Sequence, residues 1–439
     1  MNWKEEYDKK RVSLEEAASL VQSNDVVAMP IADSAPVDLM NAIAARYQEL
    51  ENVTIVSGLT PLVDSFDSKY QGHITHKSLF LQAFERMYMP GGNVDMIPFQ
   101  WSQIEYLLKE KVRCNCLIME CSKPDRNGYL SFGPSGALFN NFLINNGIKK
   151  VIAQVNSNTP YVFGTQAHVH ISQIDAFCEK DRPLIYETYG IDMGTVTEND
   201  RKIASFIVNH IKDGSTVQFG IGTIGDAVGE LLENHQDLGV HSEMLTRTMV
   251  ELARKGVING KKKSFHQGKM IVAFTMGTQD FYDYIDYNPM IEFWPLPYVN
   301  NPVNIGKNDN LISINSALSV DLTGQVCSES IGHSQYSGTG GQLDFVRGAR
   351  LSKNGKTFLA LSSVADTDKG LVNRIPAVMP PGTIITTPRT DVQYIVTEYG
   401  IADLRYKSIS DRVKAMIPLA HPDFREQLEK DALEMGLLK

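Results

Sequence analysis

Long hydrophobic segments are absent from this 439-residue sequence, which has no stretch of about 18 consecutive apolar residues. Because a helix needs roughly that length to cross a bilayer, the sequence predicts no transmembrane span. Residues 1–7 are acidic and aromatic, whereas a secretory signal has a basic start followed by an apolar run. We therefore expect a cytoplasmic protein without a membrane partner.

Cysteine is also scarce, and the Cys-x-x-Cys spacing of zinc and redox sites is missing. The five cysteines are Cys114, Cys116, Cys121, Cys178 and Cys327. Their odd number in a large chain favours buried free thiols over disulfides. No cluster of His, Cys and carboxylate residues has metal-ligand spacing, and no Gly-x-Ser-x-Gly motif indicates a serine hydrolase. We expect no metal cofactor.

Long runs of Lys and Arg are missing as well, and the formal net charge is -9. This balance opposes nonspecific attraction to polyanions and provides no basic stripe, so no nucleic-acid partner is expected. An anionic cofactor would have to be held by local groups.

What the sequence does contain is an alternation of strand and helix patterns. Its length exceeds the range in which a single core keeps growing, which predicts two domains or a duplicated unit. Near the start, residues 13–16 have the spacing of a capping box ahead of a helix. A strand, a small-residue loop, a helix and a second strand are then predicted at residues 25–30, 31–35, 36–50 and 53–58. This order favours a parallel sheet.

The same order recurs in the second half of the chain. A helix, a strand, a glycine-rich loop, a helix and a strand are predicted at residues 199–211, 215–219, 220–225, 226–232 and 238–243. The fold class is therefore α/β, with two similar open α/β domains and mainly parallel sheets. A charged segment that ends in Pro183 indicates a boundary near residues 180–195. We predict an N-terminal domain at 1–185 and a C-terminal domain at 186–439.

The glycine-rich loop allows three interpretations. Gly220, Gly222 and Gly225 follow a strand and open a helix, and an acidic residue, Glu243, comes about 20 residues later, as in the dinucleotide-binding fingerprint. The same loop suits another phosphate-bearing ligand, because glycines let the backbone approach a phosphate and a helix N-terminus favours an anion. Glycines at a tight turn also serve packing alone. Local spacing leaves all three open.

Five segments, in order along the chain, resemble family I CoA-transferases. They are Ser122 to Ser131, Gln218 to Gly222, Gly239 to Met244, Ser337 to Phe345 and Val396 to Leu404. The sequence is most similar to the 4-hydroxybutyrate and butyryl-CoA:acetate CoA-transferase branch, which also resembles proteins named acetyl-CoA hydrolases. Lys123 departs from the pattern, because a proline is common there.

The resemblance implies a CoA-transferase-like fold with the active site in the cleft between the domains. It implies that Glu243 attacks a short-chain acyl-CoA, and that a glutamyl-CoA thioester then passes CoA to an acceptor carboxylate such as acetate by a ping-pong mechanism. CoA is then both substrate and covalent intermediate, and no NAD is expected. The identities of the acyl group and acceptor acid stay open, as does a homo-oligomeric state.

The resemblance also implies the site residues. Asn315 and the backbone N–H of Gly338 or Gly340 would stabilise the oxyanion, although Asn315 also fits a plain turn and the glycines a plain loop. The implied CoA-binding residues are Gln218, Phe219, Gly220, Ile221, Gly222, Gly338, Gly340 and Gly341.

Other polar residues are not assigned catalytic roles. His241 would share the strand face of Glu243, but a structural histidine is the favoured interpretation. Four residues lie in family-like segments near the C-terminus, but a solvated or capping role explains them as well as a functional one does: Glu398, Asp403, Arg405 and His421. The loops at 31–34 and 87–92 are expected to close over the acyl group. The rival functions are an acyl-CoA hydrolase with the same intermediate and an NAD-dependent dehydrogenase.

Overall fold

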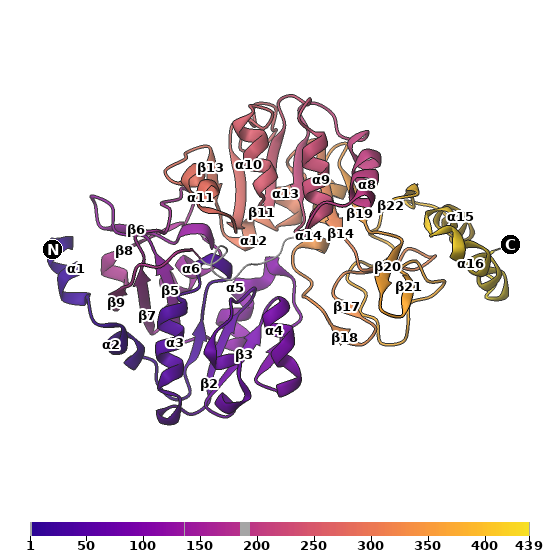
Figure 1. Ribbon diagram of the computed structural model, residues 1–439. Coiled ribbons are helices and arrows are strands. Elements are labelled where there is room, and N and C mark those ends of the chain that lie inside the picture. Colours follow the sequence, from indigo (N-terminus) through magenta and orange to yellow (C-terminus); the bar gives the residue numbers. More distant parts are fainter. Residues whose placement is uncertain (1, 136, 185–193, 439) are drawn as a thin grey trace. The chain divides into compact units, whose positions relative to one another are not determined.

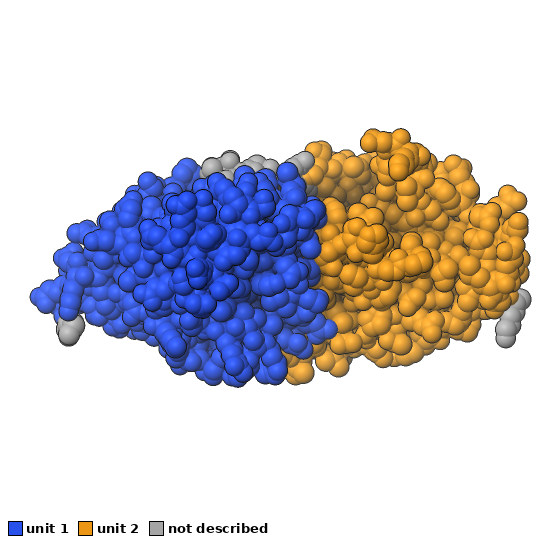
Figure 2. All heavy atoms as spheres, turned by 90° about the horizontal axis from the view of Figure 1, so that it is seen from below, with its two compact units in different colours: residues 1–191, 271–299 blue, residues 192–270, 300–439 orange. Residues whose placement is uncertain are grey.

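The computed structural model describes residues 2–135, 137–184 and 194–438 (Figure 1). The chain divides into two compact units, shown in separate colours in Figure 2. Unit 1 comprises residues 1–191 and 271–299, and unit 2 comprises residues 192–270 and 300–439. The predicted boundary at 185/186 lies outside the described residues, and the predicted ranges did not assign 271–299 to the first unit. The domain ranges stay a prediction.

Unit 1 contains a seven-stranded sheet in the order β4-β3-β2-β1-β5-β7-β9, in which every neighbouring pair is parallel. Its strands are β1 (Val26–Ala28), β2 (Val53–Ser57), β3 (Ile74–Ser78), β4 (Val94–Met96), β5 (Cys116–Cys121), β7 (Lys150–Val155) and β9 (Ala176–Glu179). A separate antiparallel pair joins β6 (Tyr129–Ser131) and β8 (His168–His170). Parallel strands buried on both faces require helices on the sheet.

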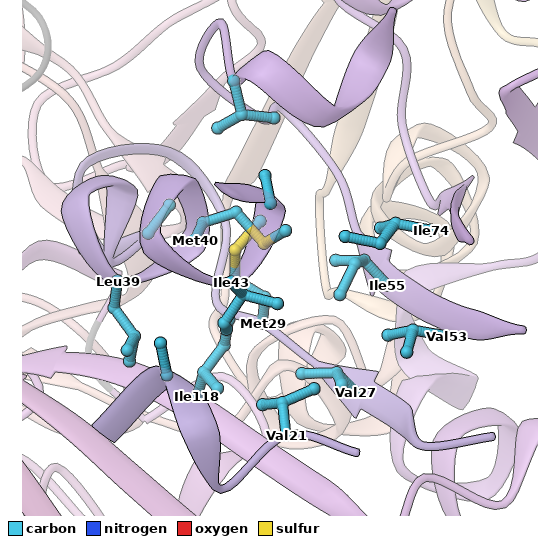
Figure 3. Close-up of a cluster of buried hydrophobic side chains, with 14 of the residues drawn as sticks. Val21, Val27, Met29, Leu39, Met40, Ile43, Val53, Ile55, Ile74 and Ile118 are labelled. Carbon is cyan, nitrogen blue, oxygen red and sulfur yellow. The ribbon is translucent and has the colours of Figure 1, made fainter. Parts of the chain in front are cut away.

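The helices of the first part of the chain are α1 (Trp3–Lys10), α2 (Leu14–Ser19), α3 (Val37–Ala45), α4 (Ala83–Tyr88), α5 (Ile104–Tyr106) and α6 (Asn140–Asn145). The capping box before α2 is confirmed, because Ser13 and Glu16 satisfy each other's backbone N–H groups. Figure 3 shows part of the core that α3 forms with the sheet: Ile43 lies beside Met29, and Ile55 of β2 belongs to the same cluster. These side chains are fully buried, so truncating Ile43 to Ala would cost about 2–5 kcal/mol.

Along the chain between residues 270 and 299 lie β12 (Met270–Thr275), α11 (Gln279–Ile285), β13 (Ile291–Phe293) and α12 (Leu296–Val299). Within unit 2, the strands run in the order β11-β10-β14-β19-β22-β23. They are β10 (Thr216–Phe219), β11 (Gly239–Leu245), β14 (Leu311–Ser316), β19 (Lys356–Ala360), β22 (Tyr394–Thr397) and β23 (Gly400–Asp403). Only β23 pairs antiparallel to its neighbour among these described strands.

The helices of unit 2 are α8 (Glu198–Val208), α9 (Thr223–Leu231), α10 (Arg247–Arg254), α13 (Pro302–Gly306), α14 (Gln342–Leu351), α15 (Ile409–Met416) and α16 (Pro422–Glu434). Three antiparallel hairpins complete it: β15 (Ser319–Val320) with β16 (Val326–Cys327), β17 (Ser330–Ile331) with β18 (Ser334–Gln335), and β20 (Val364–Thr367) with β21 (Gly370–Asn373).

The two units repeat one strand pattern. In unit 1 the first strand, β1, lies between β2 and β5, with β7 and β9 following outward. In unit 2 the first strand, β10, lies between β11 and β14, with β19 and β22 following outward. The predicted fold class, two similar α/β domains with mainly parallel sheets, is confirmed. The position of the active site in a cleft between them stays a prediction.

Several expectations from composition can be compared with the described residues. All five cysteines are free, with four buried and Cys114 partly buried. Within the described ranges, no helix combines the length and apolar character needed to cross a membrane. The same ranges contain no group of three or more His, Cys, Asp or Glu residues arranged to hold a metal ion.

Candidate functional site

Glu243 lies on β11, in the part of the strand that extends beyond its pairing with β10. Val217 pairs with Val240 in the parallel ladder, and continuing this register by three residues aligns Gly220 with Glu243. Because side chains alternate along a strand, Glu243 shares a sheet face with His241, while Ser242 and Met244 point to the other face. Glu243 is the one residue of β11 that is not fully buried. The carboxylate is therefore seated in the fold but accessible.

Asn300 holds this carboxylate. Its Nδ2 donates a hydrogen bond to Oε2 of Glu243 at 2.5 Å, and the Asn300 residue is fully buried. Asn300 directly precedes Asn301, which caps α13, and Pro302, which begins it. The sequence interpretation missed Asn300, because an Asn-Asn-Pro segment signals only a helix start.

Gly341 forms the other side of the carboxylate. It is the N-cap residue of α14, and a Cβ added to it would lie 2.0 Å from Oε2 of Glu243 and 2.2 Å from Nδ2 of Asn300. No side chain fits there, so this position requires glycine. The helix start also directs the positive end of its dipole towards the carboxylate. The structure thus brings one of the predicted CoA-binding residues into contact with the predicted nucleophile.

The pKa of Glu243 is raised to about 7. Burial is the largest cause, because it disfavours the charged form; the Asn300 hydrogen bond opposes the rise, and the nearby negative charge of Asp344 adds to it. A carboxylate with this pKa is more basic and more nucleophilic than an exposed one, yet still largely ionised just above neutral pH. This is a suitable balance for covalent catalysis.

The loop before Gly341 is anchored by a buried carboxylate. Glu329 accepts hydrogen bonds from Thr386 Oγ1 at 2.9 Å and from Thr339 Oγ1 at 3.3 Å. Gly340, with φ of 58°, adopts the left-handed conformation that favours glycine. Gly338 and Gly340 are both buried. Their oxyanion role stays a prediction.

Asn315 belongs to a separate amide cluster. It lies in β14 and not in a turn, so the turn interpretation is wrong. Its Nδ2 donates to Gln218 Oε1 at 3.2 Å and to Ser313 Oγ at 3.0 Å, and its Oδ1 accepts from Gln218 Nε2 at 3.0 Å. Both amide hydrogens of Asn315 are thus engaged, so a role as oxyanion donor would require one of these bonds to break.

The glycine-rich loop follows this cluster. The N–H of Gly220 donates to the carbonyl of Ile314 at 2.8 Å, and Gly222, with φ of 128°, caps α9. Gln218 and Phe219 are buried, whereas residues 220–222 are partly or fully exposed. An exposed loop at a helix N-terminus is suited to a phosphate. Gln218 and Phe219 are the last two residues of β10, directly before the loop, and are buried. Their contact with CoA stays a prediction.

The other polar residues have structural partners. His241 is fully buried and lies 3.3 Å from Asn308 through its Nδ1, which agrees with the structural interpretation. Glu398 accepts from the N–H and Oγ of Ser363, and Asp403 accepts from the N–H of Arg405. His421 caps α16. None of these contacts involves Glu243.

The predicted loops of unit 1 are ordered turns. Residues 32–34 form a 3-10 turn in which Ala32 has φ of 52°, and residues 89–91 form another that ends at Gly92. In the segment beginning at Ser122, Asp125 accepts from the N–H groups of Asn127 and Tyr129. Their predicted role around an acyl group stays a prediction.

Comparison with known proteins adds an independent observation. Residues 1–187 match the acetyl-CoA hydrolase/transferase N-terminal domain, and residues 277–432 match the acetyl-CoA hydrolase/transferase C-terminal domain. The chain is 41% identical to the 4-hydroxybutyrate coenzyme A transferase of Clostridium kluyveri, over 98% of each protein. It is 38% identical to the butyryl-CoA:acetate CoA-transferase of Anaerostipes caccae, again over 98% of each.

Solved structures give the same result. The crystal structure of RipA from Yersinia pestis superposes with a TM-score of 0.93 and 33% identity, covering 100% of both chains. Proteins named acetyl-CoA hydrolases are less similar: the one from Candida albicans is 26% identical over 64% of this chain and 59% of its own length.

Proposed function

Because the chain belongs to the acetyl-CoA hydrolase/transferase family, we propose that it is an acyl-CoA:carboxylate CoA-transferase in which Glu243 is the nucleophile. The observation that carries the proposal is the environment of this carboxylate. It is accessible, held by Asn300, placed against a required glycine, and has a pKa raised to about 7. The sequence resemblance selected the same residue.

In the first half-reaction, the Glu243 carboxylate attacks the thioester carbonyl of an acyl-CoA. The C–S bond breaks, CoA leaves as a thiolate, and an acyl-glutamyl anhydride forms. The thiolate then attacks the glutamyl carbonyl and expels the donor acid as a carboxylate, which leaves CoA on Glu243 as a thioester. An acceptor carboxylate attacks this thioester, and the same two steps run in reverse. The energy of the thioester is conserved, and the kinetics are ping-pong.

Asn300 has two consecutive tasks in this scheme. It donates to Oε2 of Glu243, which leaves Oε1 as the attacking oxygen. When the thiolate attacks the glutamyl carbonyl, negative charge develops on Oε2, where the Asn300 donor already lies. The contact geometry therefore favours Asn300 over Asn315 as a side-chain donor to the glutamyl oxyanion, because Asn315 is engaged with Gln218 and Ser313.

The exposed loop at residues 220–222 is proposed to approach the phosphates of CoA, since it combines glycines with the N-terminus of α9. The proposed acyl groups are short, because two relatives similar over 98% of their length are named for 4-hydroxybutyrate and for butyrate and acetate. A third relative, 38% identical over 98% of its length, is named for succinyl-CoA and cyclohexane-1-carboxylate. A hydrolase would use the same intermediate with water as acceptor, but the relatives named hydrolases are more distant. The dehydrogenase interpretation needs Glu243 as a ribose-binding acid, and its placement against Asn300 and Gly341 does not favour that.

Trapping the intermediate tests the proposal. The protein is incubated with acetyl-CoA or butyryl-CoA without acceptor, and intact and peptide masses are measured. We expect a CoA-sized adduct on the peptide that contains Glu243, and its discharge to new acyl-CoA when acetate is added. Glu243→Gln should remain unmodified, while Glu251→Gln, on the exposed side of α10, should label normally. Failure to label with several acyl-CoAs would overturn the proposal, and release of free CoA in place of acyl-CoA would indicate a hydrolase.

A further inference from the structure

A cavity of about 310 Å³ lies in unit 2, away from Glu243. Its charged lining consists of three arginines, Arg350, Arg405 and Arg412, and one carboxylate, Asp391. Such a concentration of guanidinium groups contrasts with the net charge of -9 of the chain.

The topology separates this cavity from the nucleophile. Asp391 lies just before β22, and Arg405 just after β23, whose Asp403 pairs with Tyr394, the first residue of β22. The cavity is thus at the amino end of a parallel strand, whereas Glu243 lies towards the carboxyl end of β11. Along α14, Arg350 is nine residues from Gly341, a distance of about 14 Å at the rise of an α-helix.

The single carboxylate cannot neutralise the three arginines. Oδ2 of Asp391 accepts from both Nε and Nη2 of Arg347, at 3.2 and 3.1 Å, and Arg347 does not line the cavity. Its Oδ1 lies 3.5 Å from Nη1 of Arg350. The carboxylate is therefore shared with a fourth arginine, and an excess of positive charge remains in the cavity.

The other two arginines form no ion pair with an acidic side chain in the described part of the chain, and Asp321 attracts Arg412 only at longer range. Arg412, 8% exposed, donates through Nη1 to the carbonyls of Thr323 and Arg389, which are neutral. Nη2 of Arg405 is buried and makes no hydrogen bond to any described residue. A buried, unpaired guanidinium N–H carries a desolvation cost that an anionic acceptor would remove.

We propose that this cavity binds a phosphate group. Guanidinium groups match the oxygens of a phosphate through paired N–H donors, and a dianion would offset the positive charge that Asp391, shared with Arg347, leaves in the cavity. The phosphate could belong to a free phosphorylated metabolite or to CoA itself. The proposal concerns a site separate from Glu243 and does not depend on the proposed transferase activity.

Inorganic phosphate is the probe for the test. Binding to the full chain is measured by calorimetry at low ionic strength, with Arg405→Gln and Arg350→Gln as variants. Arg201→Gln, on exposed α8, is the matched control. We expect one saturable phosphate per chain, at least about tenfold weaker binding in either cavity variant, and no change in the control. If Arg405→Gln fails to fold, Arg350→Gln, whose side chain is 42% exposed, gives the same test.

Two results would overturn the proposal: no saturable binding up to about 10 mM phosphate, or equal affinity in wild type and both cavity variants. A second titration in saturating CoA identifies the source of the phosphate. Competition would assign the cavity to a phosphate of CoA, and unchanged affinity would assign it to a separate phosphorylated metabolite. Glu243→Gln should bind phosphate like wild type, so failure of the transferase proposal would not affect this result.

Discussion

Each unit contains a glutamate on a parallel strand of its sheet, Glu120 on β5 in unit 1 and Glu243 on β11 in unit 2. Glu120 is fully buried and accepts hydrogen bonds from Arg182, Gln154, Asn156 and Thr159 at 2.8 to 3.2 Å. Glu243 keeps some exposure and is held by Asn300, with Asp344 adding a repulsive negative charge.

Burial raises the pKa of both carboxyls, but the opposing groups differ. The Arg182 guanidinium and the polar donors Gln154, Asn156 and Thr159 stabilise the Glu120 carboxylate, whereas the Asn300 amide stabilises the Glu243 carboxylate. A carboxylate whose lone pairs are all occupied serves structure, because attack would cost several hydrogen bonds. A carboxylate with one firm donor and an accessible oxygen can react. The difference lies in the surroundings and not in the residue type.

The largest expected effect is on activity. Glu243→Gln removes the nucleophile, so transferase turnover should fall at least about 1,000-fold. Glu243→Asp should also be severely impaired, because shortening the side chain by one methylene withdraws the carboxylate from Asn300 and from the substrate. Steady-state kinetics with acetyl-CoA and butyrate would measure both. Activity within tenfold of wild type in Glu243→Gln would contradict the assignment.

The matching change in unit 1 should affect stability. Glu120→Gln removes the closer of the two carboxylates beside the Arg182 guanidinium, 12% exposed, and leaves Asp38 at 3.9 Å, so the cost is at most about 3–5 kcal/mol. Thermal unfolding should shift down by roughly 10 °C. Glu251→Gln, with a half-exposed side chain, is the control and should shift little. An unchanged melting temperature in Glu120→Gln would show that the two carboxylates differ less than the hydrogen bonds indicate.

Gly341→Ala tests the contact on the other side of Glu243. The added Cβ displaces the carboxylate or Asn300, and a shift of about 1 Å reduces turnover roughly 100-fold. Ser205→Ala, at an exposed position of α8, is the control. Turnover of both variants would be compared at saturating substrate. Equal activities would mean that the glycine at the start of α14 is not needed to place the nucleophile.

The pH dependence should report the raised pKa of Glu243. Only the carboxylate attacks, so kcat/KM should fall about tenfold between pH 8 and pH 6. The Asn300 hydrogen bond lowers the pKa, and Asn300→Ala should therefore move the acid limb to higher pH. A flat profile across this range, or a limb that stays in place in the variant, would contradict the origin of the shift.

The smallest expected effect concerns stability at Glu243 itself. Its pKa of about 7 in the folded protein lies above the ordinary glutamate value of 4.5, so the folded state binds the proton more tightly than the unfolded chain does. The stabilisation from the protonated form is complete below about pH 4.5 and is lost as pH rises through 7. Relative to wild type, Glu243→Gln should gain stability between pH 5 and pH 8, by at most about 3 kcal/mol. A difference in melting temperature that does not change with pH would contradict this.

Much of the fold could be predicted because local patterns agree with the tertiary structure. The predicted strand at 215–219 is observed as Thr216–Phe219, and the capping box at Ser13 begins α2. The predicted helix at 36–50 is shorter, since α3 ends at Ala45 and a 3-10 turn follows. Helix ends depend on local hydrogen bonds that apolar periodicity does not report.

The site was harder to predict, because its partners meet only in the folded chain. Glu243 was identified by resemblance, and Gly341 was assigned to CoA with no indication that it contacts the carboxylate. Asn300 gave no signal, since its neighbours Asn301 and Pro302 account for the local motif as a helix cap. Asn315 was expected to be an oxyanion donor, but its amide donates to Ser313 on the same strand and to Gln218 on β10. The sequence alone does not place Gln218 beside Asn315.

The contact of Gly341 with Glu243 has a consequence for synthesis of the chain. Asn300 lies 57 residues after Glu243, and Gly341 comes later still. The start of α14 must meet β11, which closes a loop from Glu243 to Gly341, before all of the contacts around the carboxylate are formed. Closing long loops is a slow step in folding. A nascent chain that ends before Gly341 lacks both this glycine and Asp344, whose negative charge contributes to the raised pKa of Glu243. Covalent labelling by acyl-CoA would therefore mark only molecules that have completed this closure.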